Sequence, residues 1–299
     1  MPLICGPPFL SMLLLQRSYR SLAVKSVRCF STATRAVDLA FEKYPTAKAT
    51  KPPIVICHGL FGSKQNWNSL AKAMSSRFSR DVYAVDLRNH GDSPHSEVHT
   101  YEAMSADLLQ FLDTHQLKDT VLLGHSMGGK AVMMTALRQP EIVSKLVVVD
   151  MPPVSLYLSR NFGNYVDAMR EIEQANPSRQ SEADKILAKY EPNVGIRMFL
   201  LTNLRRQKDD RLKFRVPYEI LGRSLDQIGS FESASGVFNK PTLFIAGGKS
   251  PYYPPFKEYH EQIHQMFPQS TLEVVEGAGH WVHAEKPDVV LNHVASFIG

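Results

Sequence analysis

Short apolar runs rich in β-branched residues alternate along this chain with longer amphipathic stretches. Six runs are apolar at nearly every position, which is typical of strands buried on both faces: PIVICHG, DVYAVD, TVLLGHS, KLVVVD, PTLFIAGG and TLEVVEG. Between them lie segments with apolar residues at helical spacing, such as NWNSLAKAMSSRF and MSADLLQFLDTHQL. This alternation predicts an α/β fold with a mostly parallel, doubly wound sheet. The segment VDLAFEKYP is expected to add an antiparallel edge strand.

The alternation stops between about Val154 and Asn239. This stretch is charged, contains no run typical of a buried strand, and has apolar residues three and four apart in NYVDAMREIEQA and SEADKILAKY. An insertion followed by a return to the sheet predicts a helical cap over the carboxyl ends of the strands, where ligands of open α/β sheets bind. The expected organisation is a presequence at 1–36, the first part of the core at 37–153, the cap at 154–238 and the second part of the core at 239–299.

The first part of the chain has the composition of a targeting segment. Residues 1–37 contain five basic residues and no acidic one, mixed with serine, leucine and aromatic residues. This composition predicts a mitochondrial presequence and a location in the mitochondrial matrix. The segment VRCFST resembles a matrix-protease site, with a cut near Phe30 or Ser31. A secretory signal built on FLSMLLL and a disordered tail are the alternatives.

Charge, cysteine and hydropathy narrow the class of protein. The chain has 34 Lys and Arg residues and 29 Asp and Glu residues; because five of the basic residues lie in the presequence, the rest of the chain is balanced. A nucleic acid partner is therefore not implied. Cys5 and Cys29 also lie in the presequence, so only Cys57 is left after cleavage, which predicts no internal disulfide and a reducing compartment. No apolar run reaches the roughly 18 residues that span a bilayer, so no transmembrane segment is expected.

The segment VLLGHSMGGKAV places Ser126 between an apolar run and a helical pattern. This is the strand-turn-helix context of the G-x-S-x-G motif, in which a sharp turn exposes the serine hydroxyl above the sheet. Gly128 and Gly129 would allow the following helix to approach closely. We therefore interpret Ser126 as the nucleophile, with His125 and Met127 lining the pocket beside it.

Two backbone N–H groups are candidates for an oxyanion hole, which stabilises the negative oxygen formed during acyl transfer. One belongs to Met127, directly after the nucleophile. The other belongs to Leu60 in CHGLFGS, in the loop that follows an earlier strand. His58 in this loop is interpreted as a packing and hydrogen-bonding residue rather than a base, and Cys57 as a buried apolar residue.

The general base is expected near the carboxyl terminus, after the last strand. VVEGAGHWVHAEKP offers His280 and His283. His280 lies in the glycine-containing loop directly after the strand, whereas His283 falls near the start of the closing helix, in which Pro287 suits the first turn. His280 is therefore the predicted base.

The acid of the triad is less conventional in this sequence. Many α/β-hydrolases carry it after the strand that follows the cap, but here that segment is LFIAGGKSPYY, with Ser250 where the aspartate would be. Asp150, which ends KLVVVD one strand earlier, can also reach the histidine. Asp86, with Arg88, Asn89 and Asp92 in DLRNHGDSP, is interpreted as part of a structural turn. The order Ser126, Asp150, His280 is that of nucleophile, acid and base in this fold.

Six segments together carry a resemblance to a known family: HGLFGS, DLRNHGDSPHS, GHSMGGK, VVVDMPPVS, LLTNL and AGHWVHAEKP. They resemble the mitochondrial branch of the α/β-hydrolase-fold family that includes animal α/β-hydrolase domain proteins of this type and fungal ethanol acetyltransferases. The resemblance covers nearly the whole chain after residue 37. It implies a triad acid at Asp150 and assistance to the histidine from Ser250. It also implies ester hydrolysis and, for the yeast members, acetyl transfer from acetyl-CoA to alcohols.

The predicted chemistry is acyl transfer through Ser126. His280, oriented by Asp150, would take the serine proton, and Ser126 would attack an ester or thioester carbonyl. If water then attacks the acyl-enzyme, the protein is an esterase or thioesterase; if an alcohol attacks, it is an acyltransferase. Because water is always available, hydrolysis is our main hypothesis and alcohol acetyl transfer the alternative.

Further expectations concern the surroundings of this chemistry. An alcohol acceptor would need a hydrophobic niche, for which Phe61, Met127 and Trp281 are the candidates. No metal or organic cofactor is required by the mechanism. A non-catalytic role, as a binding partner of another matrix enzyme, is a second alternative, although a scaffold would have no chemical need for all three triad residues.

Overall fold

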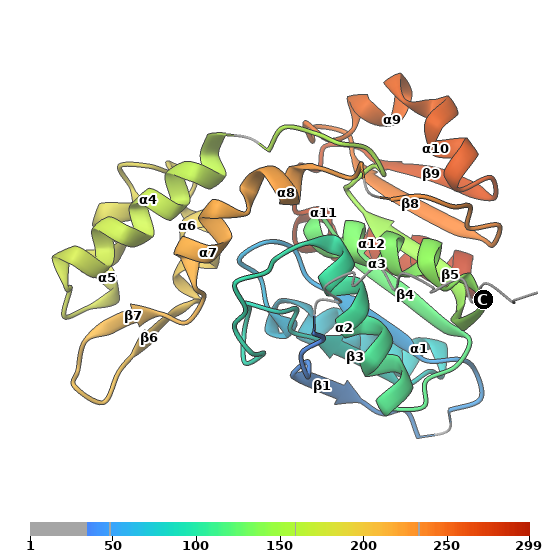
Figure 1. Ribbon diagram of the computed structural model, residues 1–299, viewed down its shortest axis with the longest axis horizontal. Coiled ribbons are helices and arrows are strands. Elements are labelled where there is room, and N and C mark those ends of the chain that lie inside the picture. Colours follow the sequence, from blue (N-terminus) through green and yellow to red (C-terminus); the bar gives the residue numbers. More distant parts are fainter. Residues whose placement is uncertain (1–34, 48, 159, 233) are drawn as a thin grey trace, which may run out of the picture. The chain divides into compact units, whose positions relative to one another are not determined.

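A computed structural model of the chain describes residues 35–47, 49–158, 160–232 and 234–299, so the presequence expected at 1–36 lies almost entirely outside the described residues. Seven strands form one sheet in the order β1-β3-β2-β4-β5-β8-β9 (Figure 1). Strand β1 pairs with β3 antiparallel, and all other pairs in this sheet are parallel. The strands are β1 Phe41–Tyr44, β2 Ile54–Cys57, β3 Val82–Val85, β4 Thr120–His125, β5 Val143–Val149, β8 Thr242–Gly247 and β9 Ser270–Val275. The predicted α/β-hydrolase fold, with its mostly parallel sheet and antiparallel edge strand, is confirmed.

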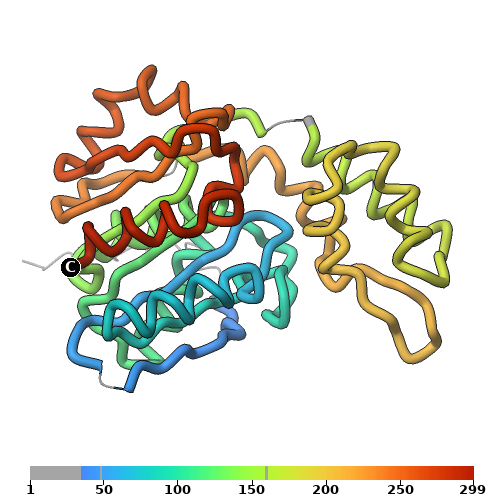
Figure 2. The backbone as a smooth tube through the Cα atoms, turned by 180° about the vertical axis from the view of Figure 1, so that it is seen from behind, coloured from blue at the N-terminus to red at the C-terminus, as the bar shows by residue number. Residues whose placement is uncertain are grey.

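Helices cover both faces of the sheet. One apolar cluster joins the sheet to α1 and α12, which lie side by side in the view from behind (Figure 2). A second cluster joins the other face to α2, α3, α9 and α10. The helices are α1 Asn68–Phe78, α2 Tyr101–Thr114, α3 Met127–Arg138, α9 Pro254–Glu258, α10 His260–Met266, α11 Val282–Glu285 and α12 Pro287–Ile298. Short 3-10 helices, η1 at Lys64–Trp67 and η2 at Pro140–Ile142, complete the connections.

Strand β9 differs in its exposure from the other five strands that were predicted to be buried on both faces. Its sequence is apolar enough to suggest burial on both faces, yet Thr271, Leu272 and Glu273 are all exposed. The reason is its position, because β9 is the last strand of the sheet and pairs only with β8. The expectation of burial on both faces was therefore wrong for this strand.

The stretch expected to form the cap lies between β5 and β8. It contains α4 Arg160–Ala175, α5 Gln180–Leu187, α6 Val194–Leu201, α7 Tyr218–Arg223 and α8 Leu225–Gly229, together with a hairpin of β6 Leu204–Arg206 and β7 Leu212–Phe214. The sequence predicted no buried strand here, but Leu204 and Phe214 pair in the hairpin and both are buried. The division into presequence, core and cap at 154–238 remains a prediction.

Among the described residues, none of the helices combines the length and the apolar character that crossing a bilayer requires.

Candidate active site

Ser126 lies at the sharp turn between β4 and α3. Its backbone has φ 53° and ψ −120°, a conformation that residues other than glycine rarely adopt. Close packing around the turn holds this conformation: a Cβ at Gly124 would lie 2.3 Å from the Gly128 carbonyl oxygen, and one at Gly128 would lie 2.4 Å from that of His58. The predicted need for small residues beside the serine thus has a measurable cause.

The structure brings Ser126, His280 and Asp150 into one hydrogen-bonded line. His280 Nε2 lies 3.0 Å from Ser126 Oγ, and His280 Nδ1 lies 2.7 Å from Asp150 Oδ2. Ser126 follows β4, Asp150 follows β5 and His280 lies in the loop after β9, so all three come from the carboxyl ends of parallel strands. Asp150 is fully buried and the other two side chains are at most 9% exposed. A proton on Ser126 could therefore pass to a histidine whose second nitrogen is held by a carboxylate.

Asp150 accepts hydrogen bonds from two further groups. The N–H of Gly247 donates to Oδ1 at 2.8 Å, and the Ser250 hydroxyl donates to Oδ2, the oxygen that also receives the proton of His280 Nδ1. The residue itself has φ 54°, a backbone conformation that residues other than glycine rarely adopt. The sequence implied that Ser250 assists the histidine; its hydroxyl contacts Asp150 instead, so any assistance passes through the carboxylate.

Asp86, the other candidate acid, is held in a separate group. Its carboxylate accepts from the backbone N–H of Lys64 at 2.7 Å and from that of Asp92 at 2.9 Å. It also forms an ion pair with Lys64 Nζ at 2.5 Å. These contacts tie the loop after β3 to η1, in keeping with its interpretation as part of a structural turn.

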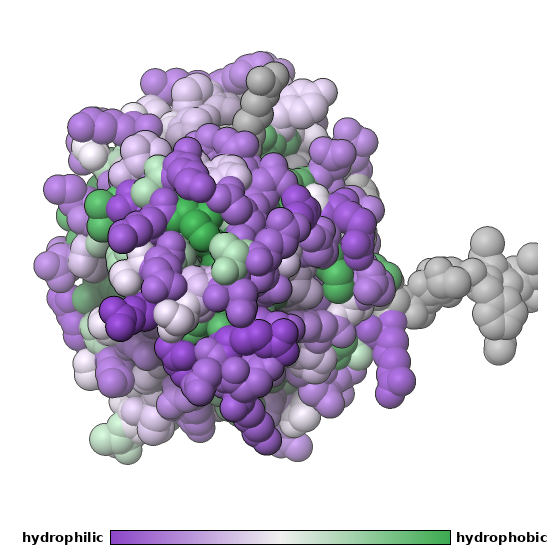
Figure 3. Space-filling model, turned by 90° about the vertical axis from the view of Figure 1, so that its left-hand side faces the viewer, coloured by the Kyte–Doolittle hydropathy of each residue, from purple (hydrophilic) through white to green (hydrophobic). Residues whose placement is uncertain are grey.

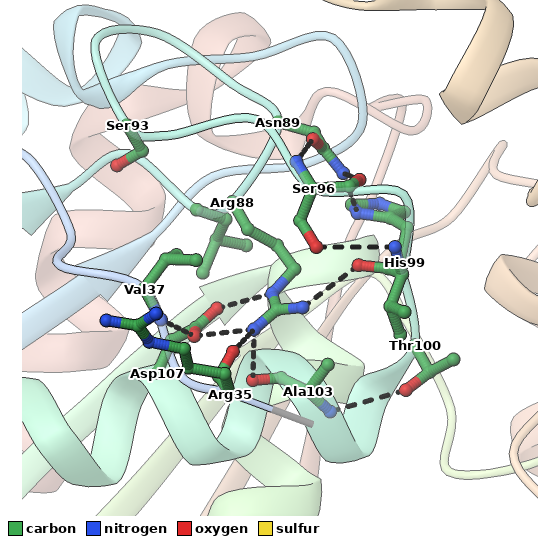
Figure 4. A network of polar contacts seen from close by, with 12 residues as sticks. Arg35, Val37, Arg88, Asn89, Ser93, Ser96, His99, Thr100, Ala103 and Asp107 are labelled. Carbon is green, nitrogen blue, oxygen red and sulfur yellow. Dashed lines mark hydrogen bonds and ion pairs between the residues drawn. The ribbon is translucent and has the colours of Figure 1, made fainter. Parts of the chain in front are cut away.

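The same loop is anchored by a buried ion pair (Figure 4). Arg88 donates from Nε to Asp107 Oδ2 at 2.6 Å and from Nη2 to Asp107 Oδ1 at 2.7 Å, and both side chains are inaccessible to solvent. Asn89 adds hydrogen bonds to both the N–H and the carbonyl of Ser96. The loop therefore has a fixed conformation, and from it His90 Nε2 accepts the N–H of Phe61 in the oxyanion loop at 3.1 Å.

Both predicted oxyanion donors lie beside Ser126. Leu60 lines the same small cavity as Ser126, and its N–H has no acceptor among the residues that the structure describes. Met127 is the first residue of α3, so its N–H has no acceptor within the helix. The stretch between β5 and β8 also contacts this loop, since Asn203 Nδ2 donates to the Phe61 carbonyl at 2.7 Å.

Three buried histidines surround the line of Ser126, His280 and Asp150. His58 Nε2 accepts the N–H of Leu87 at 3.1 Å, which agrees with its predicted structural role, and burial lowers its pKa. His125 contacts the carbonyl oxygen of His280 through Nε2 at 2.9 Å. Burial, and then the neighbouring His280, lower the pKa of His283 to about 3. These histidines are thus neutral near pH 7 and add no positive charge beside His280.

Trp67 stacks on His283, a contact that was not predicted from the sequence. The ring of Trp67 is parallel to that of His283, with centroids 4.4 Å apart. Trp67 Nε1 and His283 Nδ1 are buried and have no hydrogen-bond partner among the described residues. No motif signals this pair, because Trp67 is 216 positions away in sequence and only the fold brings the rings together.

The space next to Ser126 is a chamber of about 20 Å³. Trp281 lines it, as expected for the acceptor niche, but Phe61 and Met127 do not and are buried in the apolar core instead. Two cap residues that the sequence did not point to, Phe162 and Phe199, take their place. Residues on both sides of the stretch between β5 and β8, and residues within that stretch, therefore line the space beside Ser126.

A nucleophile at a strained strand-helix turn, with a carboxylate after the next strand of the sheet and a histidine after the last strand, defines a serine hydrolase of the α/β type. Residues 52–287 match the model of the family described as alpha/beta hydrolase fold, and the chain belongs to that family.

Relatives of known name agree with this class. The chain is 43% identical over 291 residues to the sn-1-specific diacylglycerol lipase ABHD11 of Mus musculus, covering 94% of each chain. It is 37% identical over 267 residues to a Saccharomyces cerevisiae protein named "Probable alcohol acetyltransferase", covering 83% of this chain and 77% of that one. A solved structure named "Marine microorganism esterase" superposes with a TM-score of 0.81 at 30% identity, over 88% of this chain and all of that one.

Proposed function

We propose that this protein hydrolyses carboxylic esters through an acyl-enzyme on Ser126. The observation that carries the proposal is the hydrogen-bonded line from Ser126 Oγ through His280 to Asp150, with distances of 3.0 and 2.7 Å. His280 takes the serine proton as Oγ attacks the ester carbonyl. The N–H groups of Leu60 and Met127 then hold the oxyanion, each contributing roughly 3–4 kcal/mol to the transition state.

The second half of the reaction regenerates the enzyme. His280 gives its proton to the leaving alcohol, and the acyl group remains on Ser126. A water molecule loses a proton to His280 and attacks the acyl carbon; the bond from that carbon to Ser126 Oγ then breaks, His280 returns the proton to Oγ, and a carboxylic acid is released. Asp150 stays ionised throughout and stabilises the imidazolium that forms in each half.

Acylglycerols and simple esters are the first substrates to test, because the mouse relative is named a diacylglycerol lipase and the similar solved structure an esterase. Thioesters react by the same steps and belong to the same panel. The test is labelling by a fluorophosphonate probe, followed by assays of wild type and Ser126→Ala on this panel. Labelling and hydrolysis that both disappear in Ser126→Ala support the proposal. A well-folded wild type that is neither labelled nor active would instead favour the role of a non-catalytic binding partner.

Alcohol acetyl transfer is the second candidate, favoured by the relative in S. cerevisiae and by the small chamber beside Ser126, which holds few water molecules. In this reaction an alcohol replaces water in attacking the acyl-enzyme, so an ester forms instead of an acid. Supplying acetyl-CoA with and without ethanol, and measuring acetate against ethyl acetate, separates the two reactions. Predominant ethyl acetate at modest ethanol concentration would reverse our order of preference.

A further inference from the structure

The chamber beside Ser126 is too small for a whole substrate. At about 20 Å³ it holds little more than a water-sized group, whereas ligand sites typically occupy some 300–1,000 Å³. A neighbouring groove of about 400 Å³ lies between α6 of the cap and the segment that follows His280. Its walls include the apolar side chains of Ile196, Phe199, Trp281 and Ala284.

The groove and the chamber share part of their walls. Phe199 from the cap and Trp281 from the core line both spaces, as do Asn66 and His283. The rings of Phe199 and Trp281 meet edge to face, with centroids 6.3 Å apart. These two aromatic side chains therefore lie where the groove and the chamber adjoin.

The groove lies on the side of the site from which the alcohol leaves. His280 must place its proton on the leaving oxygen, so the first atoms of the alcohol lie beside the imidazole. The ring of Trp281 is 5.3 Å from that of His280, and the wall continues through His283, Ala284 and Glu285.

One face of the molecule shows no broad apolar surface for a long alcohol. On the face shown in Figure 3, hydrophobic patches are small and separated by hydrophilic side chains. A broad apolar surface would be needed to bind an alkyl chain outside the groove.

We propose that this groove receives the alcohol part of the ester, and that the substrates of this site are esters of alcohols with a hydrocarbon chain. The inference rests on the proposed function. In the first step the bond between Ser126 Oγ and the acyl carbon forms, the bond from that carbon to the alcohol oxygen breaks, and the proton from His280 passes to the alcohol oxygen. The free alcohol then leaves along the groove past Phe199 and Trp281.

The test uses variants in which a larger side chain fills the groove, and it compares kcat/KM on two series of esters. Ile196→Trp places a larger side chain in the groove, and Gly195→Leu does so from the same wall with only the Asn193 side chain near its Cβ. Val194→Trp is the matched control, because Val194 is 58% exposed on the same helix and does not line the groove. One series lengthens the alcohol, from ethyl acetate to decyl acetate. The other lengthens the acid, from ethyl acetate to ethyl decanoate.

The expected kcat/KM of wild type and of Val194→Trp rises at least about tenfold from ethyl to decyl acetate, since even one methylene bound in a hydrophobic pocket is worth about tenfold or more. Both filling variants should lose this rise, so that their ratio of kcat/KM for decyl acetate to that for ethyl acetate falls at least about tenfold below the wild-type ratio. Thermal unfolding of each variant checks that it is folded.

Three results would overturn the assignment while Ser126 still reacts with the fluorophosphonate. The first is a wild-type kcat/KM that does not change with the length of the alcohol. The second is an equal loss of kcat/KM on esters of short and long alcohols in both filling variants. The third is a change of kcat/KM in the filling variants that is confined to the series of lengthened acids. If no ester is cleaved and Ser126 is not labelled, the proposed function fails and the assignment of the groove fails with it.

Discussion

At the scale of single residues, Asp150 is the side chain on which the proposed chemistry most depends after Ser126 and His280. Its carboxylate accepts from His280, Ser250 and the Gly247 N–H, so replacing one oxygen changes charge and hydrogen bonding together. We predict that Asp150→Asn folds normally but loses about four orders of magnitude in kcat, because the imidazolium is no longer stabilised or held in the correct tautomer. Steady-state kinetics and thermal unfolding measure both effects.

Ser250→Ala makes a smaller change at the same carboxylate, because it removes only one hydrogen-bond donor. The Ser250 hydroxyl contributes one neutral donor to a carboxylate, and a bond of this kind is worth roughly 1.5–3 kcal/mol. We expect a loss of about tenfold in kcat, because the charge on Asp150 remains. Near-normal activity of Asp150→Asn, or a loss in Ser250→Ala as large as in Asp150→Asn, would contradict these roles.

The sequence predicted the order of these residues better than their contacts. The segments around Ser126 and His280 have recognisable local sequence patterns. The role of Asp150, in contrast, depends on which strands lie next to each other in the sheet. Strand β5 lies next to β8, and the Asp150 N–H donates to the Ile245 carbonyl at 2.7 Å. This pairing places Ser250 against Asp150, and no local sequence pattern specifies it.

At the scale of elements, the loop after β3 depends on the buried pair of Arg88 and Asp107. Removing one partner of such a pair leaves an uncompensated buried charge. We predict that Asp107→Ala lowers the free energy of unfolding by about 3–5 kcal/mol, measured by chemical denaturation. Glu219→Ala, which breaks the exposed pair with Arg170, is the control and should have a much smaller effect. Equal effects in the two variants would argue against a special role for the buried pair.

Helix α3 is joined to the end of α8 by Lys130. Its ammonium donates to the Gly229 carbonyl at 2.6 Å, and burial lowers the pKa of Lys130 to about 7. The unfolded chain keeps this proton up to about pH 10, so the unfolded state binds more protons between these values and the free energy of unfolding rises with pH.

Lys130→Met removes this titration and tests it. Wild type should gain stability relative to Lys130→Met when the pH is raised from 6.5 to 9, because the folded protein no longer buries a charge. Denaturation curves of both proteins at both pH values give the comparison, in which the other titrating groups cancel. A difference between the proteins that does not change with pH would show that Lys130 keeps its proton in the folded state.

Strands that consist of continuous apolar runs were predicted correctly from the sequence. Features that depend on the tertiary structure, such as the short hairpin and the exposure of the last strand, were not. The buried strands β2, β3, β4 and β5 coincide with apolar runs. The hairpin of β6 and β7 has strands of three residues and charged side chains between its apolar ones, so no window of sequence shows a strand period. The exposure of β9 follows from the strand order, which a local pattern does not contain.

At the scale of the whole molecule, the reacting centre depends on contacts between distant parts of the chain. Core residues supply Ser126, Asp150 and His280, while Phe162 and Phe199 from the stretch between β5 and β8 close the chamber. The cap also tethers the oxyanion loop through Asn203. The stretch between β5 and β8 therefore contributes both to the walls beside Ser126 and to the position of the oxyanion loop.

The last prediction concerns where the protein works. We propose import into the mitochondrial matrix, with removal of about the first 30 residues, because residues 1–37 hold five basic residues and no acidic one and VRCFST resembles a matrix-protease site. Mass spectrometry of the endogenous protein should find a mature N-terminus near Phe30 or Ser31. Replacing the basic residues of the segment by glutamine, as in Arg17→Gln and Arg28→Gln, should prevent import, since the membrane potential acts on their charge. An endogenous protein that begins at Met1 or Pro2 would contradict import with cleavage.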